Sequence, residues 1–192
     1  MILVDRDLKA RAERMGIEPG HINPASVDLS LGGHIIEYRT PDPNIDMEWA
    51  NELNGRSLTT EQMRDYQEQV LLHAERNEYD LEPGQAFLFR PGYFYLAHSA
   101  EEIRMPSDYA ALLTLKSTTG RRGLEHLNAG WIDPDFVGQI TLEFAPELPV
   151  LVRIGDRLVQ LTYLECSSLP EKGYALTGRY QGQKKATPPR LT

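Results

Sequence analysis

The sequence predicts a mainly β protein that folds as a single domain, a sandwich or barrel with a few short helices. From Leu81 onward, short runs rich in β-forming residues alternate with Pro-Gly, Asp-Pro-Asp and Ile-Gly-Asp turns. This spacing is typical of antiparallel sandwiches and barrels, because βαβ units would need helices of about 10–15 residues between strands. A length of 192 residues, with 41% hydrophobic and 25% charged residues, suits one globular domain.

The first expected element is a short helix over residues 6–15. Asp5 can cap its N-terminus, and Gly16 can end it in the left-handed conformation. Apolar residues recur at helical spacing and would form its buried face: Leu8, Ala12 and Met15.

Seven strands are expected. In the INPASVDLSLG run, Val27, Leu29 and Leu31 alternate with polar residues, which predicts a half-buried strand. The other six follow Leu81, at residues 85–89, 93–97, 110–115, 139–144, 150–154 and 158–164.

Residues 42–82 form an acidic segment. They hold eleven of the 28 acidic residues and three of the 20 basic ones, so the whole net charge of −8 lies here. After a Pro- and Asn-rich loop, Thr59 and Gln62 make a capping box that starts a helix. Apolar residues then follow at helical spacing: Met63, Tyr66, Val70 and Ala74. We interpret residues 42–80 as an acidic helical insertion with a structural or subunit-facing role.

Composition excludes several classes of protein. The single cysteine, Cys166, cannot form an internal disulfide, and the C-x-x-C element of zinc-dependent deaminases is absent. The lone cysteine indicates a reducing cytoplasm. The N-terminal stretch has no basic region before an apolar run, and no membrane span is visible, so we expect no membrane partner. The net charge argues against a nucleic-acid partner.

The stretch from 116 to 144 carries the strongest functional signal. Directly after an expected strand, the run KSTTGRR brings together a lysine, three hydroxyl residues, a glycine and two arginines. Hydroxyls, backbone N–H groups and cations at a tight turn suit a polyphosphate, although the Walker pattern GxxxxGK[ST] is missing. On composition alone, a polar surface turn is the alternative.

These motifs resemble those of the dCTP deaminase family, within the dCTP deaminase/dUTPase superfamily. KSTTGRRGL is similar to K/R-S-S-x-G/A-R-x-G-L, and AGWIDPDFVGQITLEF to A-G-x-I-D-P-G-F/W-x-G-x-I-T-L-E. Further matching blocks occur in order: ILVDRDLKA, INPASVDLSLG, LEPGQAFLFRPG and RYQGQKKATPPR. The resemblance implies a dUTPase-like distorted β-barrel, jelly-roll-like, over residues 1–192, assembled as a homotrimer with its sites between subunits.

The resemblance also implies the catalytic residues. Glu143 would take a proton from the water that attacks C4 of cytosine, and Ser117 and Arg121 would hold that water and support charge on the ring. A carboxylate on a buried apolar strand would have a raised pKa, which suits a general base. An outward-facing strand glutamate is the alternative reading of Glu143.

The implied substrate contacts extend along the second half of the chain. Asp133 would meet the 3′-hydroxyl of the deoxyribose, and Phe136 would pack on the sugar. The whole implied set is Lys116, Thr118, Thr119, Gly120, Ala129, Asp133, Phe136, Thr141, Leu142, Gln160, Tyr174, Arg179 and Gln183. Mg²⁺ would accompany the substrate triphosphate, with no zinc and no metal ligands from the protein. His126 matches a histidine linked to feedback by dTTP, and a structural histidine is the alternative.

The C-terminal stretch is basic. Arg179, Lys184, Lys185 and Arg190 occur there without an acidic residue, among Gly and Pro residues that disfavour a packed element. A solvated, mobile tail would explain this composition. The family resemblance implies instead a lid at about 178–192 that closes over the triphosphate.

The motifs favour hydrolytic deamination of dCTP to dUTP and ammonia. A bifunctional enzyme forming dUMP and pyrophosphate is the alternative, since the A-G-W-I-D run with Asp133, together with Gln160, resembles bifunctional members and dUTPases equally well. A dUTPase, a dCMP-acting relative and a non-catalytic nucleotide-binding regulator are further readings. Arg121 and Glu143 argue against a pure dUTPase, which needs neither.

Overall fold

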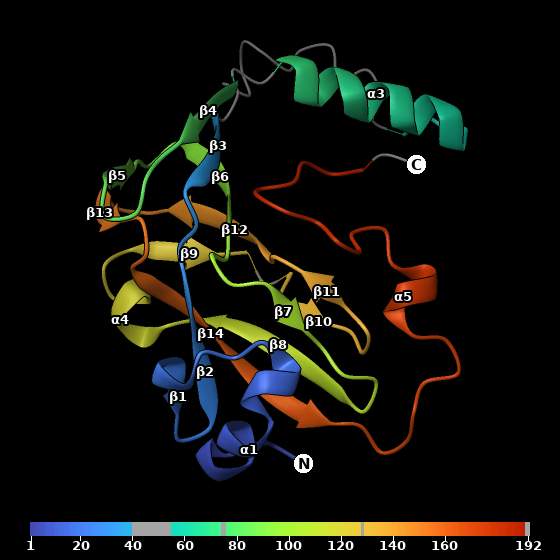
Figure 1. Ribbon diagram of the computed structural model, residues 1–192. Helices are drawn as coiled ribbons and strands as arrows, with labels where there is room; N and C mark the ends of the chain where they lie inside the picture. The colour runs from blue at the N-terminus through green and yellow to red at the C-terminus, as the bar shows by residue number, and fades with distance from the viewer. Residues whose placement is uncertain (40–54, 74–75, 128, 191–192) are drawn as a thin grey trace.

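The computed structural model describes residues 1–39, 55–73, 76–127 and 129–190, and the fold is mainly β with a few short helices, as predicted (Figure 1). The helices are α1 (Asp5–Met15), the 3₁₀ turn η1 (Pro19–His21), α3 (Thr60–His73), α4 (Ser117–Gly120) and α5 (Tyr174–Thr177). The first seven strands are β1 (Ile22–Asn23), β2 (Ser26–Ser30), β3 (His34–Arg39), β4 (Arg76–Asp80), β5 (Ala86–Phe89), β6 (Tyr93–His98) and β7 (Ile103–Arg104). The others are β8 (Tyr109–Leu115), β9 (Leu124–His126), β10 (Trp131–Ile132), β11 (Val137–Gly138), β12 (Thr141–Pro146), β13 (Val150–Arg153) and β14 (Arg157–Glu165). None of the described helices is long and apolar enough to cross a bilayer.

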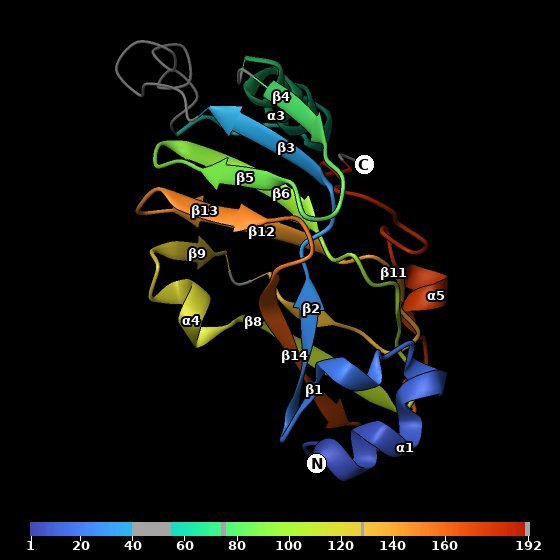
Figure 2. The same ribbon diagram turned by 60° about the vertical axis from the view of Figure 1, so that its left-hand side comes forward.

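Two five-stranded antiparallel sheets form the body of the protein (Figure 2). One has the order β1-β2-β14-β8-β10 and the other the order β4-β3-β6-β12-β9, while β11-β7 and β13-β5 form small two-stranded sheets. All seven expected strands are present. Inward-facing side chains of both large sheets meet in one continuous hydrophobic core, for example Leu161 of β14 and Phe144 of β12.

Helix α1 buries the expected face of Leu8, Ala12 and Met15, and Gly16 ends it with φ of 68°. The prediction that Asp5 caps this helix is wrong. The helix begins at Asp5 itself, the capping position is Val4, and no side chain caps it. The Asp5 carboxylate instead accepts a 3.1 Å hydrogen bond from Lys9, one turn later in the helix. A negative charge in the first turn also interacts favourably with the helix dipole.

Strand β2 is buried on both faces, so the prediction of a half-buried strand is wrong. Asp28 is only 3% exposed although it occupies a polar position of the alternating pattern. Its carboxylate accepts a hydrogen bond of 2.8 Å from the Asn23 side chain and forms an ion pair with Lys116. Burial of this charge is tolerated because both partners satisfy it.

The expected capping box starts α3. The Thr59 backbone N–H donates to the Gln62 side chain at 2.9 Å, and the Gln62 N–H donates to Thr59 Oγ1 at 3.2 Å. Met63 is 54% exposed, so the apolar residues of this helix do not all pack on the body of the chain. The end of the 42–80 segment belongs to the sheet, because β4 pairs with β3. The opening loop, Ala74 and the side chain of Val70 lie outside the described residues.

The C-terminal segment, residues 178–190, docks against β11 and β12. Gly182 N–H donates to Val137 O at 2.8 Å, and Gln139 N–H donates to Gln183 O at 3.0 Å. Ala186 is buried against a second hydrophobic cluster on the outer face of the sheet, with Ile36, Tyr38 and Leu96. The segment therefore has a defined docked position, and its action as a lid stays a prediction.

Candidate active site

A cavity of about 540 Å³ lies between the outer face of the β3-β6-β12 sheet and the C-terminal segment. Strand residues form its floor, the segment from 129 to 136 forms one wall, and residues after 173 form the other. The lining residues are Tyr38, Arg39, Phe94, Leu96, Ala129, Trp131, Ile132, Asp133, Phe136, Ile140, Thr141, Glu143, Tyr174, Tyr180, Gln183, Thr187 and Pro189. Such a mostly apolar cleft with a few polar groups is typical of a small-molecule site.

Strand β12 supplies the floor through its two-residue period. Leu142 and Phe144 are fully buried in the core, so Thr141 and Glu143 point to the opposite face and line the cavity. Glu143 is half-buried, and burial raises the pKa of its carboxyl group. The direction agrees with the expectation for a carboxylate on this strand, and a raised pKa favours a carboxyl group that both accepts and returns a proton.

The wall from 129 to 136 holds a carboxylate and two aromatic rings. Asp133 is half-buried, and its Oδ1 accepts a hydrogen bond of 3.0 Å from Nε1 of Trp131. Phe136 is buried, and its ring meets the Tyr174 ring edge-on, with centroids 5.5 Å apart. This contact joins the wall to the C-terminal part of the chain.

The C-terminal segment closes the cavity from outside. The Gln183 side chain is buried and donates to the Gln139 carbonyl at 2.8 Å. The Thr187 N–H lies 3.4 Å from Thr141 Oγ1 on the floor. These contacts bring residues more than forty positions apart in the sequence to one site.

Seven of the site residues expected from the sequence line this one cavity: Ala129, Asp133, Phe136, Thr141, Glu143, Tyr174 and Gln183. Five of them come from the motif at 129–144, Gln183 comes from the motif at 179–190, and Tyr174 lies between the two motifs. Leu142 lies in the same strand, but its side chain belongs to the core. Arg179 is exposed, and its side chain is not part of the lining.

The remaining expected residues lie elsewhere in the chain. They are Lys116, Ser117, Thr118, Thr119, Gly120, Arg121 and Gln160, and none of them lines the cavity. Helix α4, which carries Ser117 to Gly120, and helix α5 lie at opposite sides of the molecule in both views (Figures 1 and 2). Within one chain, the expected phosphate-binding turn and the expected general base therefore belong to two separate places.

The turn expected to bind phosphate has its own polar surroundings. Lys116 is paired with the buried Asp28. Nearby in the same sheet, Gln160 lies between Ser26 Oγ at 3.3 Å and Thr114 Oγ1 at 3.4 Å. Ser117 and Arg121 are exposed. Exposed hydroxyl and guanidinium groups next to an anchored lysine are able to donate hydrogen bonds to an anionic ligand.

Ten further residues line the cavity and were not predicted as site residues from the sequence: Tyr38, Arg39, Phe94, Leu96, Ile132, Ile140, Trp131, Tyr180, Thr187 and Pro189. The rings of Tyr38 and Phe94 stack with centroids 6.0 Å apart. Phe94 and Leu96 sit two residues apart on β6, and that spacing was the available signal for a shared face.

His126 is the last residue of β9, and its side chain is buried. Its ring meets Phe144 edge-on with centroids 5.7 Å apart, and burial lowers the pKa of the imidazole to about 4. Its Nε2 atom has no hydrogen-bond partner among the described residues. These surroundings favour the structural reading of His126, and feedback by dTTP stays a prediction.

No group of three or more His, Cys, Asp or Glu side chains in the described part of the chain is arranged to hold a metal ion. A cation held by substrate phosphates needs no such group, because phosphate oxygens and water fill most of the coordination sphere of Mg²⁺. The expectation that Mg²⁺ arrives with the triphosphate stays a prediction.

Comparisons with known proteins agree with the motifs. Residues 2–166 match the family described as dCTP deaminase-like. A protein of Dictyoglomus thermophilum named "dCTP deaminase, dUMP-forming" is 32% identical over 203 residues, which cover 100% of this chain and 95% of the relative. A protein of Mycolicibacterium paratuberculosis with the same name is 35% identical and covers 99% and 95%.

A solved structure shows the fold. The 2′-deoxycytidine 5′-triphosphate deaminase of Agrobacterium tumefaciens superposes with a TM-score of 0.58 at 24% sequence identity. The superposition covers 84% of this chain and 47% of that one, so this chain spans about half of its length.

Proposed function

The chain belongs to the dCTP deaminase-like family, and from that premise we propose that it deaminates dCTP and then hydrolyses the product to dUMP and pyrophosphate. The motifs alone favour dUTP as the final product. The names of the curated relatives, which say dUMP-forming, favour the bifunctional alternative. We therefore adopt the alternative as the proposed function.

The observation that carries the proposal is the position of Glu143. Its carboxyl group lines a cavity of about 540 Å³, is half-buried, and has a pKa raised by burial. Asp133 lines the same cavity, so two carboxyl groups with different surroundings face one ligand. The Asp133 carboxylate accepts a hydrogen bond from the Trp131 indole. Among the described residues, no side chain donates a comparable hydrogen bond to Glu143, and only burial shifts its pKa. Different surroundings allow two carboxyl groups to take different roles.

In the proposed deamination, water adds to C4 of the cytosine ring. Glu143 takes one proton from this water and delivers it to N3, which leaves a tetrahedral carbon bearing a hydroxyl and the amino group. The hydroxyl proton then passes through Glu143 to the amino group, the C4–N bond breaks, and ammonia leaves as the C4 carbonyl of uracil forms. The raised pKa of Glu143 makes both the acceptance and the return of a proton feasible.

In the proposed second step, water attacks the α-phosphorus of dUTP. Asp133 accepts its proton, the bond from the α-phosphorus to the bridging oxygen breaks, and pyrophosphate leaves with dUMP as the other product. The half-buried Asp133 is held by Trp131, which fixes the direction of its carboxylate. When bound with the triphosphate, Mg²⁺ would spread the negative charge of the phosphates.

The residues expected to contact phosphate and to hold the attacking water would then come from a second subunit. Lys116, Ser117 and Arg121 do not line the cavity of their own chain. In a homotrimer, α4 of one protomer would face the Glu143 cavity of its neighbour and complete the site. Interfaces built from two different surface patches form closed rings in this way.

The proposal is tested by identifying the products formed from dCTP, with chromatography for the nucleotides and an assay for pyrophosphate. We expect dUMP, ammonia and pyrophosphate in equal amounts, and dUTP as the product of Asp133→Asn. Release of dUTP alone by the wild-type protein would restore the purely deaminating reading. Hydrolysis of added dUTP with dCTP untouched would reject deamination, and binding without turnover of either nucleotide would support a regulator.

A further inference from the structure

Asp135 has a backbone conformation that non-glycine residues rarely adopt. Its φ is 68°, and among the described non-glycine residues only Lys185 shares a positive value. The family motif resembled by this stretch has glycine at this position. Aspartate tolerates the left-handed region better than most residues, but the surrounding contacts must still hold it there.

The side chain of Asp135 makes two contacts that a glycine could not make. Ser107 Oγ, in the loop before β8, donates to its Oδ1 at 2.5 Å. Its Oδ2 lies against Gly173, where an added Cβ would come within 1.7 Å of that oxygen. Gly173 thus leaves room for a carboxylate at the start of the C-terminal part of the chain.

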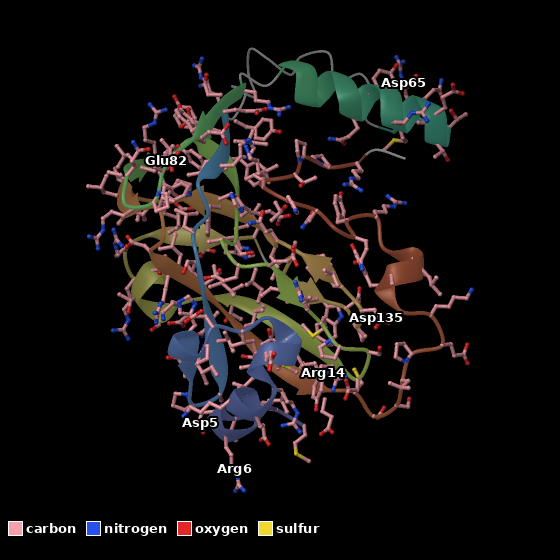
Figure 3. All side chains as sticks on the ribbon, viewed as in Figure 1. Asp5, Arg6, Arg14, Asp65, Glu82 and Asp135 are labelled. Atoms are coloured by element: carbon pink, nitrogen blue, oxygen red, sulfur yellow. The ribbon has the colours of Figure 1, made fainter. Side chains whose placement is uncertain are left out.

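The backbone around Asp135 is also tied to the C-terminal part of the chain. Gln181 Nε2 donates to the Asp135 carbonyl at 3.0 Å, and Gln181 Oε1 accepts from Val137 N–H at 3.1 Å. Tyr174 N–H donates to the Pro134 carbonyl at 3.0 Å. In Figure 3, Asp135 lies on the side of the molecule where the C-terminal part passes.

We propose that Asp135 is a positioning residue that couples the sugar-binding turn to the C-terminal segment. The turn carries Asp133 on one side of Asp135 and Phe136 on the other, and both line the cavity. By bridging Ser107 and Gly173, the carboxylate fixes this turn and the base of the segment relative to each other. Asp135 thereby sets the position of both cavity walls without touching the substrate. The inference rests on the proposed function for its kinetic test alone.

Three single variants separate the carboxylate from the backbone conformation. Asp135→Gly keeps the positive φ and removes the carboxylate. Asp135→Asn keeps both the conformation and an acceptor for Ser107, and serves as the matched control. Ser107→Ala removes the same hydrogen bond while Asp135 stays in place, and it replaces Asp135→Gly if that variant does not fold.

We expect Asp135→Gly to raise KM for dCTP about tenfold with a smaller loss in kcat, because misplaced binding groups weaken substrate alignment. Trypsin should also cleave faster at the exposed Arg179 and Lys184, since the segment is no longer held at its base. Asp135→Asn should restore KM and the cleavage rate to within about twofold of wild type, because asparagine still accepts from Ser107.

Gly173→Ala provides an independent test. In the wild-type background its Cβ would displace the Asp135 carboxylate, so cleavage by trypsin should accelerate as in Asp135→Gly. In the Asp135→Gly background the space is free, and adding Gly173→Ala should change the cleavage rate less than about twofold.

Wild-type KM and wild-type cleavage rates in both Asp135→Gly and Ser107→Ala would overturn the inference, and so would equal effects of Gly173→Ala in the two backgrounds. A loss of thermal stability with unchanged KM and cleavage would assign Asp135 a purely structural role and reject the coupling. If the wild-type protein does not act on dCTP, the proposed function fails, while the proteolysis measurements still decide the coupling.

Discussion

Nε1 of Trp131 donates a hydrogen bond of 3.0 Å to Oδ1 of Asp133. Trp131 is the first residue of the two-residue strand β10, which pairs with β8, and Asp133 directly follows that strand. This hydrogen bond places the indole beside the carboxylate and can fix its direction.

Trp131→Phe should therefore impair the second proposed step more than the first. We expect the rate of dUTP hydrolysis to fall roughly three- to tenfold, because hydrogen bonds to charged groups contribute about 1.5–3 kcal/mol when buried and less at a partly exposed site. The Trp131 side chain is 55% exposed, which favours the lower end. The measurement is the dUMP to dUTP ratio from dCTP, with dUTP hydrolysis assayed separately.

Trp131→Leu, which also lacks the indole N–H, serves as the companion variant. If the hydrogen bond is what matters, both variants should shift the product toward dUTP by a similar factor. A normal product ratio in both would show that Asp133 does not depend on the indole for its direction.

Glu143→Gln should abolish deamination while keeping nucleotide binding. The amide preserves the shape of the side chain but cannot take a proton from water, so we expect a loss of at least about a hundredfold, the usual contribution of a general base. Binding of dCTP, measured by calorimetry, should weaken far less. Retention of more than about a tenth of the wild-type rate would remove Glu143 from the role of base.

The pH dependence follows from the raised pKa of Glu143. Its base form must be ionised, so the deamination rate should rise with pH through a pKa above the ordinary value of 4.5. A raised pKa in the folded state also means that ionising Glu143 costs folding free energy, a cost absent below about pH 4.5 and complete above the folded-state pKa.

Glu143→Gln should accordingly raise the free energy of unfolding at about pH 7.5 and change it little at about pH 4. Urea denaturation at the two pH values measures this difference. Thr141→Val, on the same face of β12, has no titratable group and should show no such pH-dependent gain. A pH-independent effect of Glu143→Gln would mean that its pKa is not raised in the folded protein.

The floor of the cavity was predictable because apolar and polar residues alternate along strand β12. Leu142 and Phe144 are apolar and buried, and Glu143 between them is polar and faces the cavity, which is the two-residue pattern of a strand with one face in the core. The family motif adds the role of the carboxyl group, which periodicity cannot supply.

The rest of the cavity was not predictable, for physical reasons. In β3, the residues from His34 to Tyr38 are all buried, because the inner face meets the core and the outer face lies under the C-terminal segment. Such a strand has no alternation to show that Tyr38 lines a cavity. Strand β10 spans only two residues, too few for a period. The burial of Asp28 likewise depends on Lys116, a partner 88 positions away.

Removing the C-terminal segment should damage both binding and turnover. Deleting residues 178–192 takes away the part of the wall formed by Tyr180, Gln183, Thr187 and Pro189. We therefore expect KM to rise and kcat to fall together, as when a lid completes a site. Steady-state kinetics with dCTP measure both constants.

The deletion also uncovers the outer apolar cluster around Ile36 and Leu96. Light scattering is the necessary control, because an exposed apolar face promotes association. Gln183→Ala, which leaves that cluster covered, should raise KM in the same direction with a smaller effect. Unchanged kinetic constants after the deletion would make the segment a solvated tail.

The proposed site joins Ser117 of one protomer to Glu143 of its neighbour, so two inactive variants should complement each other. Ser117→Ala and Glu143→Gln should each be inactive alone. When they are refolded together, some sites combine an intact Ser117 from one chain with an intact Glu143 from another, and random mixing at equal amounts should restore about a quarter of wild-type activity.

A mixture of Glu143→Gln with the double variant lacks any intact Glu143 and should stay inactive. Mixed oligomers, isolated through two different affinity tags and still inactive, would contradict a shared site, as would a fully active monomer near 21.8 kDa in light scattering.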